Sequence, residues 1–448
     1  MSSTGALPGF RDFYPIECAE RDHIFRAWRA VAHRYGFVEY EGPPLESLEL
    51  YTKKSGQEIV DQLYTFEDKG GRAVALRPEM TPTFARMVAA RANALRKPLR
   101  WFSVPQLFRY ERQQKGRLRE HYQLNVDIVG EPGPIADAEL IAVAIDVMRE
   151  LGLTSKDVRV RVSHRQLLHA ALAAIGLNDA QQAGSFTIID KLARQPHDVT
   201  VKKFAELGVS GTLADRVLAL VGARNLDAFV AVAGVAELNA AAAPLREALQ
   251  CLDAFGLTAW IDFDPTIVRG LAYYTGIVFE LFDAQGEFRA ICGGGRYDDL
   301  LQSLGGVDLP ALGFGMGDVV LGELVRARKL MPAFGADGAA DVYVVGGPGA
   351  AGRPFGEALR LVRALREAGF STDYALNAER YASQAPRNQL ESAKKAGARA
   401  AVFFDEGGRV TAIALGGKLG DAPRWSADAG AILDGTASAG LREWLDTL

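Results

Sequence analysis

Apolar and polar residues alternate most sharply between Phe108 and Gly130, where two runs of period two flank a basic segment around Gly116. This pattern predicts a β-hairpin, because successive side chains of a strand point to opposite faces. Arg109 and Glu111 share a face of the first run, and the polar face of the return run carries His121, Gln123, Asn125 and Asp127. A solvated hairpin would alternate as well. Arginine, amide and carboxylate groups together nevertheless suit a charged, hydrogen-bonding ligand, so we predict that this face is the floor of a binding site.

The chain before the hairpin begins with a helical period. Apolar residues recur at helical spacing from Pro15 to Tyr35, and Gly36 ends the pattern. A short strand, Phe37–Glu41, follows before two prolines. Taken alone, this segment predicts a core helix that leads into an edge strand.

A second strand is predicted at Ala73–Leu76, followed by a turn at Arg77–Pro82 and a helix at Phe84–Ala92. The turn places the carboxylate of Glu79 and the hydroxyl of Thr81 at the end of a strand, where ligand contacts are common. A capping turn with an exposed glutamate explains the local sequence equally well.

The region after the hairpin changes from mixed to helical character. A helix at Ala136–Leu151 and a strand at Val158–Val162 precede a segment rich in alanine and leucine, Leu167–Leu252, in which only Phe186–Ile189 has a strand signal. This segment is predicted to be an inserted helical module. Its histidines have no second ligand three or four residues away, so no metal site is predicted.

A glycine-punctuated region follows, with three glycine-containing segments at Val268–Gly276, Gly293–Gly295 and Gly313–Gly317. None matches a Walker A loop or a dinucleotide-binding fingerprint. The glycines indicate either close backbone packing in a sheet or a flat floor for a nucleotide or amino acid. The predicted elements around them are strands at Ile277–Phe282 and Phe288–Cys292, a helix after Asp298 through Leu304, and a helix at Asp318–Lys329.

Residues Pro332–Ala340 have the composition of a linker, and a βαβαβ alternation follows them. Its predicted elements are Asp341–Val345, Pro354–Gly369, Thr372–Tyr374, Arg380–Gly397 and Ala400–Phe404. We therefore predict a small separate α/β domain. The segment Arg353–Arg399 carries nine basic and five acidic residues. That local charge suits either a phosphate-contacting face or a solvated helical face.

The composition limits the classes of protein to which this chain can belong. The 448 residues suffice for two to four domains, and the apolar content of 48% and charged content of 24% are ordinary for a globular protein. Three scattered cysteines indicate neither a disulfide framework nor a zinc site, which fits a reducing cytoplasm. No apolar run is long enough to cross a bilayer. The net charge of −4 argues against a general nucleic-acid coat.

The hairpin resembles the second signature motif of class II aminoacyl-tRNA synthetases. Its closer form, with Gln114, Arg117, Gln123 and Asp127 at this spacing, resembles the histidyl-tRNA synthetases. The resemblance is strong over Arg77–Thr81, Arg109–Gly130 and Val268–Asp298, looser at the ends and weak in the helical insert. It implies an α+β fold: an antiparallel-sheet catalytic core with a helical insertion and a C-terminal α/β anticodon-binding domain.

The resemblance implies a role for each motif in binding histidine. The Arg-Pro-Glu-x-Thr turn would hold the ammonium group, and Gln123 with Asp127 would bind the two imidazole nitrogens. Arg269 and Arg109 would act as the catalytic arginines, because guanidinium groups stabilise the charge that develops at the α-phosphate. The full set implied for histidine is Glu79, Met80, Thr81, Arg109, Gln123, Asp127, Arg269, Tyr273 and Tyr274.

The ATP-binding set that the resemblance implies is Arg109, Glu111, Arg117, His121 and Arg269. Within it, Arg117 would reach the outer phosphates, and His121 would stack on adenine. Mg²⁺ is expected with ATP, although no ligands for it are identified.

Three positions depart from the family pattern: Asp127 stands where glutamate is commoner, Ala272 where the acidic residue of Arg-Gly-Leu-Asp-Tyr-Tyr usually lies, and Val320 where the third motif usually has an arginine. A branch of the family looks similar at the last two points. The rival interpretation is a catalytically silent paralogue that serves as the regulatory subunit of ATP phosphoribosyltransferase. Such proteins lack the C-terminal domain and usually have an eroded Val268–Gly276 block.

The resemblance also sets the expected organisation and partners. Residues 1–165 and 256–331 would form the catalytic core, 166–255 the helical insertion and 336–448 the anticodon-binding domain. The expected activity is that of a histidine–tRNA ligase acting on L-histidine, ATP and tRNA(His), as a cytoplasmic homodimer without membrane association.

Overall fold

The computed structural model describes residues 5–52, 57–112, 116–192, 195–234, 238–268, 273–334, 340–346, 355–377, 386–416 and 421–448. The chain divides into two compact units, which are considered separately. The first comprises Met1–Asp12 and Glu20–Pro332, and the second comprises Phe13–Ala19 and Ala333–Leu448.

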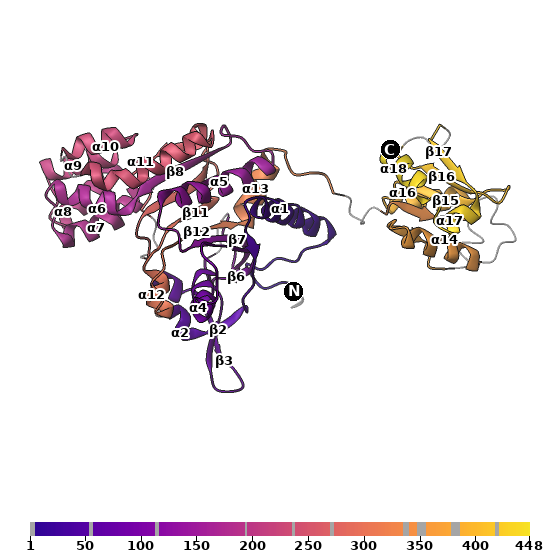
Figure 1. The fold of residues 1–448 in the computed structure, drawn as a ribbon, viewed down its shortest axis with the longest axis horizontal. Helices are drawn as coiled ribbons and strands as arrows, with labels where there is room; N and C mark the ends of the chain where they lie inside the picture. Colours follow the sequence, from indigo (N-terminus) through magenta and orange to yellow (C-terminus); the bar gives the residue numbers. More distant parts are fainter. Residues whose placement is uncertain are drawn as a thin grey trace. The chain divides into compact units, whose positions relative to one another are not determined.

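A nine-stranded, mainly antiparallel sheet forms the centre of the first unit (Figure 1). Its strand order is β1-β5-β7-β12-β11-β10-β8-β9, with β6 paired to β7 beside this path. Only the β1–β5 and β8–β9 pairs are parallel. The strand bounds are β1 Val38–Glu39, β5 Leu99–Ser103, β6 Gln106–Phe108, β7 Glu120–Val129, β8 Val158–His164, β9 Ile261–Phe263, β10 Ile277–Asp283, β11 Cys292–Arg296 and β12 Ala311–Gly317.

The predicted hairpin is present as β6 and β7, which pair antiparallel from Gln106 opposite Tyr122 to Phe108 opposite Glu120. Its first strand ends earlier than predicted, because the amide of Tyr110 donates to the carbonyl oxygen of Gln62 rather than to β7 (2.7 Å). The two faces of β7 differ as the alternation predicted. Leu124, Val126 and Ile128 are buried in the main core, while the opposite face carries the polar side chains.

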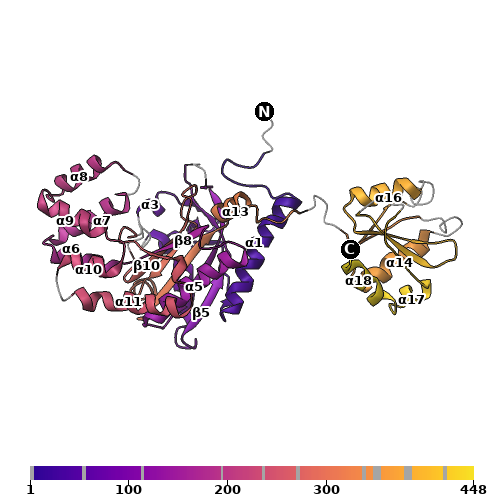
Figure 2. The same ribbon diagram turned by 90° about the horizontal axis from the view of Figure 1, so that it is seen from above.

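Helices α1, Pro15–Arg34, α5, Pro134–Glu150, and α13, Asp318–Ala327, contribute to the same core as the apolar face of β7 (Figure 2). In α5 almost every side chain between Ala136 and Met148 is buried, which agrees with its apolar sequence. A second, smaller core contains residues of α4, Thr81–Arg91, and α12, Leu300–Gly305. A three-stranded sheet, β2-β4-β3, lies in the same unit. Its strands are Leu45–Ser47, Ala73–Leu76 and Tyr64–Glu67.

The insert between β8 and β9 is helical (Figure 1). Its helices are α6 Arg165–Ala174, α7 Asp179–Asp190, α8 His197–Glu206, α9 Thr212–Val221, α10 Leu226–Ala233 and α11 Leu238–Ala254. The strand signal at Phe186–Ile189 was wrong: this segment lies in α7, whose start is fixed by a capping box between Asn178 and Gln181. Ile188 and Ile189 bury against neighbouring helices, so tertiary packing overrides their β propensity.

Both glycine runs lie inside strands. The predicted strand Phe288–Cys292 was displaced, since β11 begins at Cys292 and includes Gly293–Gly295. Gly313–Gly317 belongs to β12 and precedes helix α13 rather than opening it. Glycine has low strand propensity, but β10 and β12 bond to the two edges of β11 and hold it extended.

The second unit has a five-stranded sheet of order β14-β13-β15-β16-β17. Strands β14 and β13 run parallel to their neighbours, and β16 and β17 are antiparallel additions that the βαβαβ prediction missed. The strand bounds are β13 Val342–Val344, β14 Thr372–Tyr374, β15 Ala400–Phe404, β16 Val410–Ala414 and β17 Arg424–Ala427. The helices are α14 Phe355–Glu367, α16 Pro386–Lys395, α17 Ala429–Leu433 and α18 Ser438–Asp446.

The close packing at Gly294 leads to a stability prediction. A β-carbon at this position would collide with the carbonyl oxygen of Gly313 and would lie 2.7 Å from the α-carbon of Phe314. Gly294→Ala should therefore lower the free energy of unfolding by about 1–3 kcal/mol or more, as overpacked cores do. Denaturant unfolding would measure the change.

Gly322→Ala is the matched control, because Gly322 is buried in α13 and its added β-carbon would meet Ile24 at 3.4 Å, an ordinary contact. Alanine is about 1 kcal/mol more favourable than glycine inside a helix, so this change should be neutral or stabilising. Equal stability losses in the two variants would contradict the packing argument.

Candidate active site

Two adjoining cavities of about 260 and 290 Å³ open on the polar face of β7. They share a wall, so groups bound in the two cavities could come into contact. The residues that line both are Arg109, Glu111, Arg117, Gln123, Gly293 and Gly315.

The first cavity is built on β7 and on the glycines of the neighbouring strand. Gln123, Asn125 and Asp127 all line it, as expected from their shared strand face. Gly313 lies opposite Asp127 in the β7–β12 register, and a β-carbon there would collide with the carboxylate. A β-carbon at Gly315 would lie 2.7 Å from Cδ of Gln123. The glycines therefore leave space for the polar side chains of β7. The close packing within the sheet and the flatness of this wall of the cavity both result from the missing side chains at the glycines.

Asp127 is a buried residue of the first cavity, with 4% of its surface exposed. The hydroxyl of the fully buried Tyr297 donates a hydrogen bond to Oδ1 of Asp127. Burial raises the pKa of Asp127 to about 7, and the hydrogen bond from Tyr297 opposes that rise. The group can therefore change its protonation state near neutral pH.

The Arg77–Pro82 turn contributes a second wall of this cavity. Arg77 is buried, and its Nη1 contacts Oε1 of Glu41 (2.6 Å) and the carbonyl oxygen of Gly42 (2.7 Å). This anchored turn presents Glu79 and Thr81 to the cavity. Met80, predicted with them, is fully buried and is not among the lining residues.

Tyr273 and Tyr274 complete the first cavity. The hydroxyl of Tyr273 lies 3.5 Å from Oε2 of Glu79, and its ring contacts that of Tyr297 at 5.9 Å between centroids. Arg269 and Ala272 lie outside the described residues. The segment before them ends at Val268, whose carbonyl oxygen accepts from Nη1 of Arg165 (3.2 Å).

The second cavity is more cationic. Nε of Arg109 donates to the carbonyl oxygen of Pro78 (2.8 Å), which fixes the side chain between the two cavities. Arg117 forms an ion pair with Glu111 (2.9 Å). These residues, predicted to contact ATP, lie together, and His121 lines the same cavity.

His121 is uncharged at neutral pH. Burial lowers its pKa to about 3, with smaller contributions from the positive charges of Arg109 and Arg11. A neutral imidazole offers a flat ring without adding to the positive charge of the cavity. Val319 and Val320, at the start of α13, line the far side. The arginine position of the third motif thus presents an apolar surface here.

An ion-pair network with buried carboxylates adjoins the second cavity. Arg11 contacts Oε1 of Glu120 (2.6 Å) and Oδ2 of Asp318 (2.8 Å), and Oδ1 of Asp318 accepts from the amide of Tyr122 (2.9 Å). These contacts join the N-terminal segment, the beginning of β7 and the first turn of α13. They hold the elements that carry His121 and Val320.

Asn125 and Tyr297 line the first cavity and were among the residues not assigned a role from the sequence. Asn125 follows from the alternation of β7 and could have been found by it. Tyr297 could not, because its contact with Asp127 joins residues 170 positions apart.

No group of three or more histidine, cysteine, aspartate or glutamate side chains that could hold a metal ion occurs among the described residues. Glu79 and Glu111 are the carboxylates of the cavities besides Asp127. Mg²⁺ stays an expectation tied to ATP.

Comparison with known proteins identifies the family. Residues 9–317 match the family model described as histidyl-tRNA synthetase. The chain belongs to the histidyl-tRNA synthetase family. It is 47% identical over 410 residues to the histidine–tRNA ligase of Opitutus terrae, and the aligned region covers 90% of this chain and 91% of the relative. It is 42% identical to the histidine–tRNA ligase of Haloarcula marismortui, with 81% of this chain and 83% of the relative covered.

Solved structures show the same fold. A histidyl-tRNA synthetase from a Nostoc species superposes with a TM-score of 0.79 at 21% identity, covering 97% of this chain and 99% of the other. A Bacillus halodurans protein titled ATP phosphoribosyltransferase regulatory subunit/histidyl-tRNA synthetase gives 0.68 at 25% identity, covering 84% and 93%. The predicted fold class and the predicted histidine–tRNA ligase are confirmed. Among the described helices, none is both long and apolar enough to cross a membrane.

The raised pKa of Asp127 leads to a pH-dependent stability prediction. An unfolded aspartate titrates near 4 and folded Asp127 near 7, so stability should fall as pH rises between these values. Asp127→Asn removes that penalty. The variant should gain up to about 1–3 kcal/mol at pH 8 and less at pH 5, measured by denaturant unfolding.

Asp262→Asn is the control, because the pKa of Asp262 is shifted in the opposite direction from that of Asp127. The hydrogen bond and charge of Arg159 lower the pKa of Asp262, so its ionised form already stabilises the fold at both pH values. Its substitution should cost stability equally at pH 5 and pH 8. A loss of stability in Asp127→Asn that does not depend on pH would contradict the buried-charge argument.

Proposed function

We propose that the two cavities hold L-histidine and ATP side by side and that the chain forms histidyl-adenylate there before transferring histidine to the 3′ end of tRNA(His). A carboxylate oxygen of histidine attacks the α-phosphorus in line, and the bond to the leaving pyrophosphate breaks. Both reactants are anions, so their approach needs fixed positive charge and accurate positioning. The observation that carries this proposal is the position of Arg109 in the wall shared by the two cavities.

The first cavity would bind histidine through two sets of polar side chains, one for the ammonium group and one for the imidazole. Glu79 and Thr81 suit the ammonium group, with Tyr273 close to Glu79. Gln123 and Asp127 suit the imidazole, because an amide and a carboxyl group can each pair with one ring nitrogen. A residue of similar size without ring nitrogens would leave these buried groups unpaired, which supplies selectivity without editing.

The second cavity would bind ATP. Arg109 would contact the α-phosphate, Arg117 the outer phosphates, and the neutral ring of His121 the adenine. Glu111 would position Arg117 through their ion pair. Arg269 is proposed as the second catalytic arginine and Met80 as a further histidine contact, both on the strength of family resemblance. Mg²⁺ would enter with the nucleotide and neutralise its phosphate charge.

The organisation follows from the same proposal. Residues 1–165 and 256–331 form the catalytic core, 166–255 a helical insertion and 336–448 the anticodon-binding domain. The protein works as a cytoplasmic homodimer. A helix that leads into a strand and a proline resembles the first motif of class II synthetases, which lies at the dimer interface in that class, so Pro15–Arg34 and Val38–Glu39 are proposed to lie at the subunit interface. Val38 is 61% exposed in the single chain, which suits burial by a second subunit.

The competing function, a regulatory subunit of ATP phosphoribosyltransferase, is less well supported. The Bacillus halodurans structure bears both names, so likeness to it does not separate the two functions. The relatives of 42–47% identity bear only the ligase name. Histidine-dependent exchange of pyrophosphate into ATP by the purified chain would test the proposal, and its absence would contradict it.

The role of Asp127 in histidine binding gives a kinetic prediction. At pH 8 the carboxyl group is mostly ionised, and Asp127→Asn removes a charged hydrogen-bond partner of the ring. Such a bond is worth roughly 1.5–3 kcal/mol, so the KM for histidine should rise about ten- to a hundredfold. The KM for ATP should stay within about twofold, because Asp127 lines only the first cavity. Pyrophosphate exchange with each substrate varied in turn would measure both constants.

The second unit gives a prediction about tRNA. Arg360, Arg387, Lys394 and Lys395 are exposed on α14 and α16. Replacing these four by serine should weaken tRNA(His) binding and reduce the slope of log K against log salt by about 0.7–0.9 for each phosphate that is no longer neutralised. Histidine activation should be unchanged. Arg409→Ser with Arg424→Ser, in the same unit but outside these helices, is the control. An equal effect per removed charge in the control would show that only overall charge matters.

A further inference from the structure

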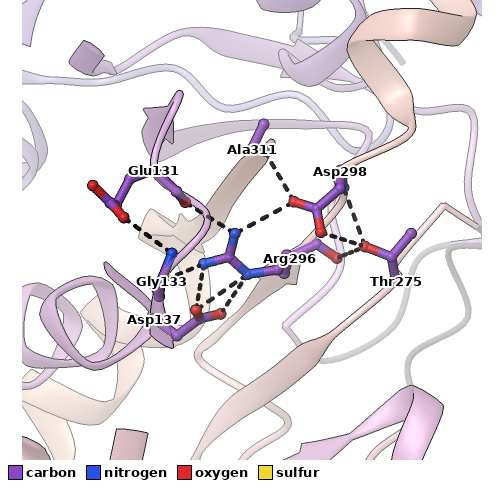
Figure 3. Close-up of polar contacts among 7 residues, drawn as sticks. All are labelled: Glu131, Gly133, Asp137, Thr275, Arg296, Asp298 and Ala311. Atoms are coloured by element: carbon purple, nitrogen blue, oxygen red, sulfur yellow. Dashed lines mark hydrogen bonds and ion pairs between the residues drawn. The ribbon is translucent and has the colours of Figure 1, made fainter. Parts of the chain in front are cut away.

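A buried arginine, Arg296, lines neither cavity but directly precedes Tyr297, which lines the first cavity. Arg296 is the last residue of β11 and has 7% of its surface exposed. Its guanidinium group pairs with the carboxylate of Asp137, with Nη2 2.5 Å from Oδ2 and Nε 3.2 Å from the same oxygen (Figure 3). Both charges are buried, and a buried pair costs several kcal/mol when one partner is removed.

The remaining donors of Arg296 reach three further residues. Nη1 donates to the carbonyl oxygen of Glu131 (3.0 Å) and contacts Oδ1 of Asp298 (3.3 Å), and Nη2 donates to the carbonyl oxygen of Gly133 (3.2 Å). Asp137 lies in the first turn of α5, and Glu131 and Gly133 lie in the turn that leads from β7 to α5. One side chain thus holds the end of β11 against α5 and against the exit of β7, the strand that carries Asp127.

The backbone of the same strand end holds the segment that carries Tyr273 and Tyr274. The carbonyl oxygen of Arg296 accepts from the amide of Thr275 (2.8 Å), and Oγ1 of Thr275 accepts from the amide of Asp298 (3.1 Å) (Figure 3). The aliphatic part of Arg296 packs on Gly276, where an added β-carbon would lie 3.0 Å from Cδ of the arginine. Residues 273–276 therefore have little freedom to move unless Arg296 moves.

Tyr297, the next residue, connects this network to the ligand pocket. Its amide donates to the carbonyl oxygen of Ala311 (2.7 Å), and the amide of Ala311 donates to Oδ1 of Asp298 (3.2 Å). Its phenol donates to Asp127, which lines the first cavity. The backbone on both sides of Tyr297 is thus fixed by contacts of Arg296 and Asp298.

We propose that Arg296 is a positioning residue for amino-acid recognition: its buried pair with Asp137 and its contacts with the 273–276 segment hold Tyr297 on Asp127 and Tyr273 beside Glu79. It does not touch the substrate. This inference rests on the proposed histidine site and assigns that site's specificity to residues outside it. An error in placing a pocket group of about 1 Å can cost on the order of a hundredfold in activity, so the effect of loosening the network should be measurable.

The test compares three variants in pyrophosphate exchange. Arg296→Lys keeps the charge but loses the planar fork, and Thr275→Val removes only the hydroxyl that accepts from the amide of Asp298. Both should raise the KM for histidine about tenfold or more and leave the KM for ATP within about twofold. Thr275→Ser keeps the hydroxyl and should therefore have the wild-type KM for histidine.

A second buried arginine–aspartate pair supplies the matched control. Arg328 contacts Oδ1 of Asp283 at 2.6 Å, with side chains 11% and 0% exposed against 9% and 3% for the Arg296–Asp137 pair. Neither Arg328 nor Asp283 lines either of the two cavities. Arg328→Lys should lower Tm by a similar amount as Arg296→Lys and leave both Michaelis constants unchanged.

The pH profile separates positioning from general stability. The hydrogen bond from Tyr297 holds the pKa of Asp127 down, so displacing the phenol should move the inflection of kcat/KM for histidine to higher pH in Arg296→Lys and Thr275→Val. Arg328→Lys should keep the wild-type inflection. Wild-type constants and inflection in the first two variants, with Tm lowered as in the control, would overturn the proposal. A wild-type chain without histidine-dependent exchange would instead overturn the proposed function, and this inference with it.

Discussion

The antiparallel register of β7 against β12 is the constraint on which the first unit depends. It places Asp127 opposite Gly313 and Asn125 opposite Gly315, so that glycines face the side chains that need space. The same register turns Leu124, Val126 and Ile128 into the main core. Because side chains alternate along a strand, a slip of one residue would move a carboxylate into the core and three large apolar groups into the cavity. Burial of the apolar face therefore also determines the position of the polar one.

This arrangement keeps charged groups in a largely buried site. Asp127 is enclosed, its pKa is raised to about 7, and its partner Tyr297 is itself buried away from water. A carboxylate in such a position costs stability in the empty protein, since a buried charge is not compensated by solvent. A ligand ring that donates a hydrogen bond to it would remove part of that cost. The proposed selectivity for histidine and the stability cost of a buried carboxylate would thus have the same physical origin.

Two groups of arginines build the site in the first unit: one lines the cavities, and the other holds the surrounding elements together. Arg109 and Arg117 lie in the cavity walls, whereas Arg11, Arg77 and Arg296 are tied to carboxylates or carbonyl oxygens behind them. The planar, always-charged guanidinium suits both tasks, because it can bind several acceptors in a fixed geometry. The supporting arginines come from the N-terminal segment, from the turn after β4 and from the end of β11, so segments far apart in sequence become parts of one site.

The sequence alone determined the features that depend on local periodicity. Alternation in residues 120–129 identified the polar, cavity-lining face of β7, and helical spacing identified α1 and α5. Apolar runs identified β4 and β15 with their observed bounds, and the βαβαβ alternation identified β14 with its observed bounds. Resemblance supplied the family and the expected roles of Glu79, Thr81, Arg109 and Gln123, which lie together in the structure. The site roles themselves, including that of Arg269 outside the described residues, stay predictions. Tertiary structure decided the rest. Glycine runs became strands because the neighbouring strands on both edges bond to them, and Phe186–Ile189 became helical because it packs among helices. Tyr297 and Arg296 gained partners more than 150 residues away in the sequence. Such contacts depend on how segments distant in the sequence pack together, and no local pattern of residues specifies that packing.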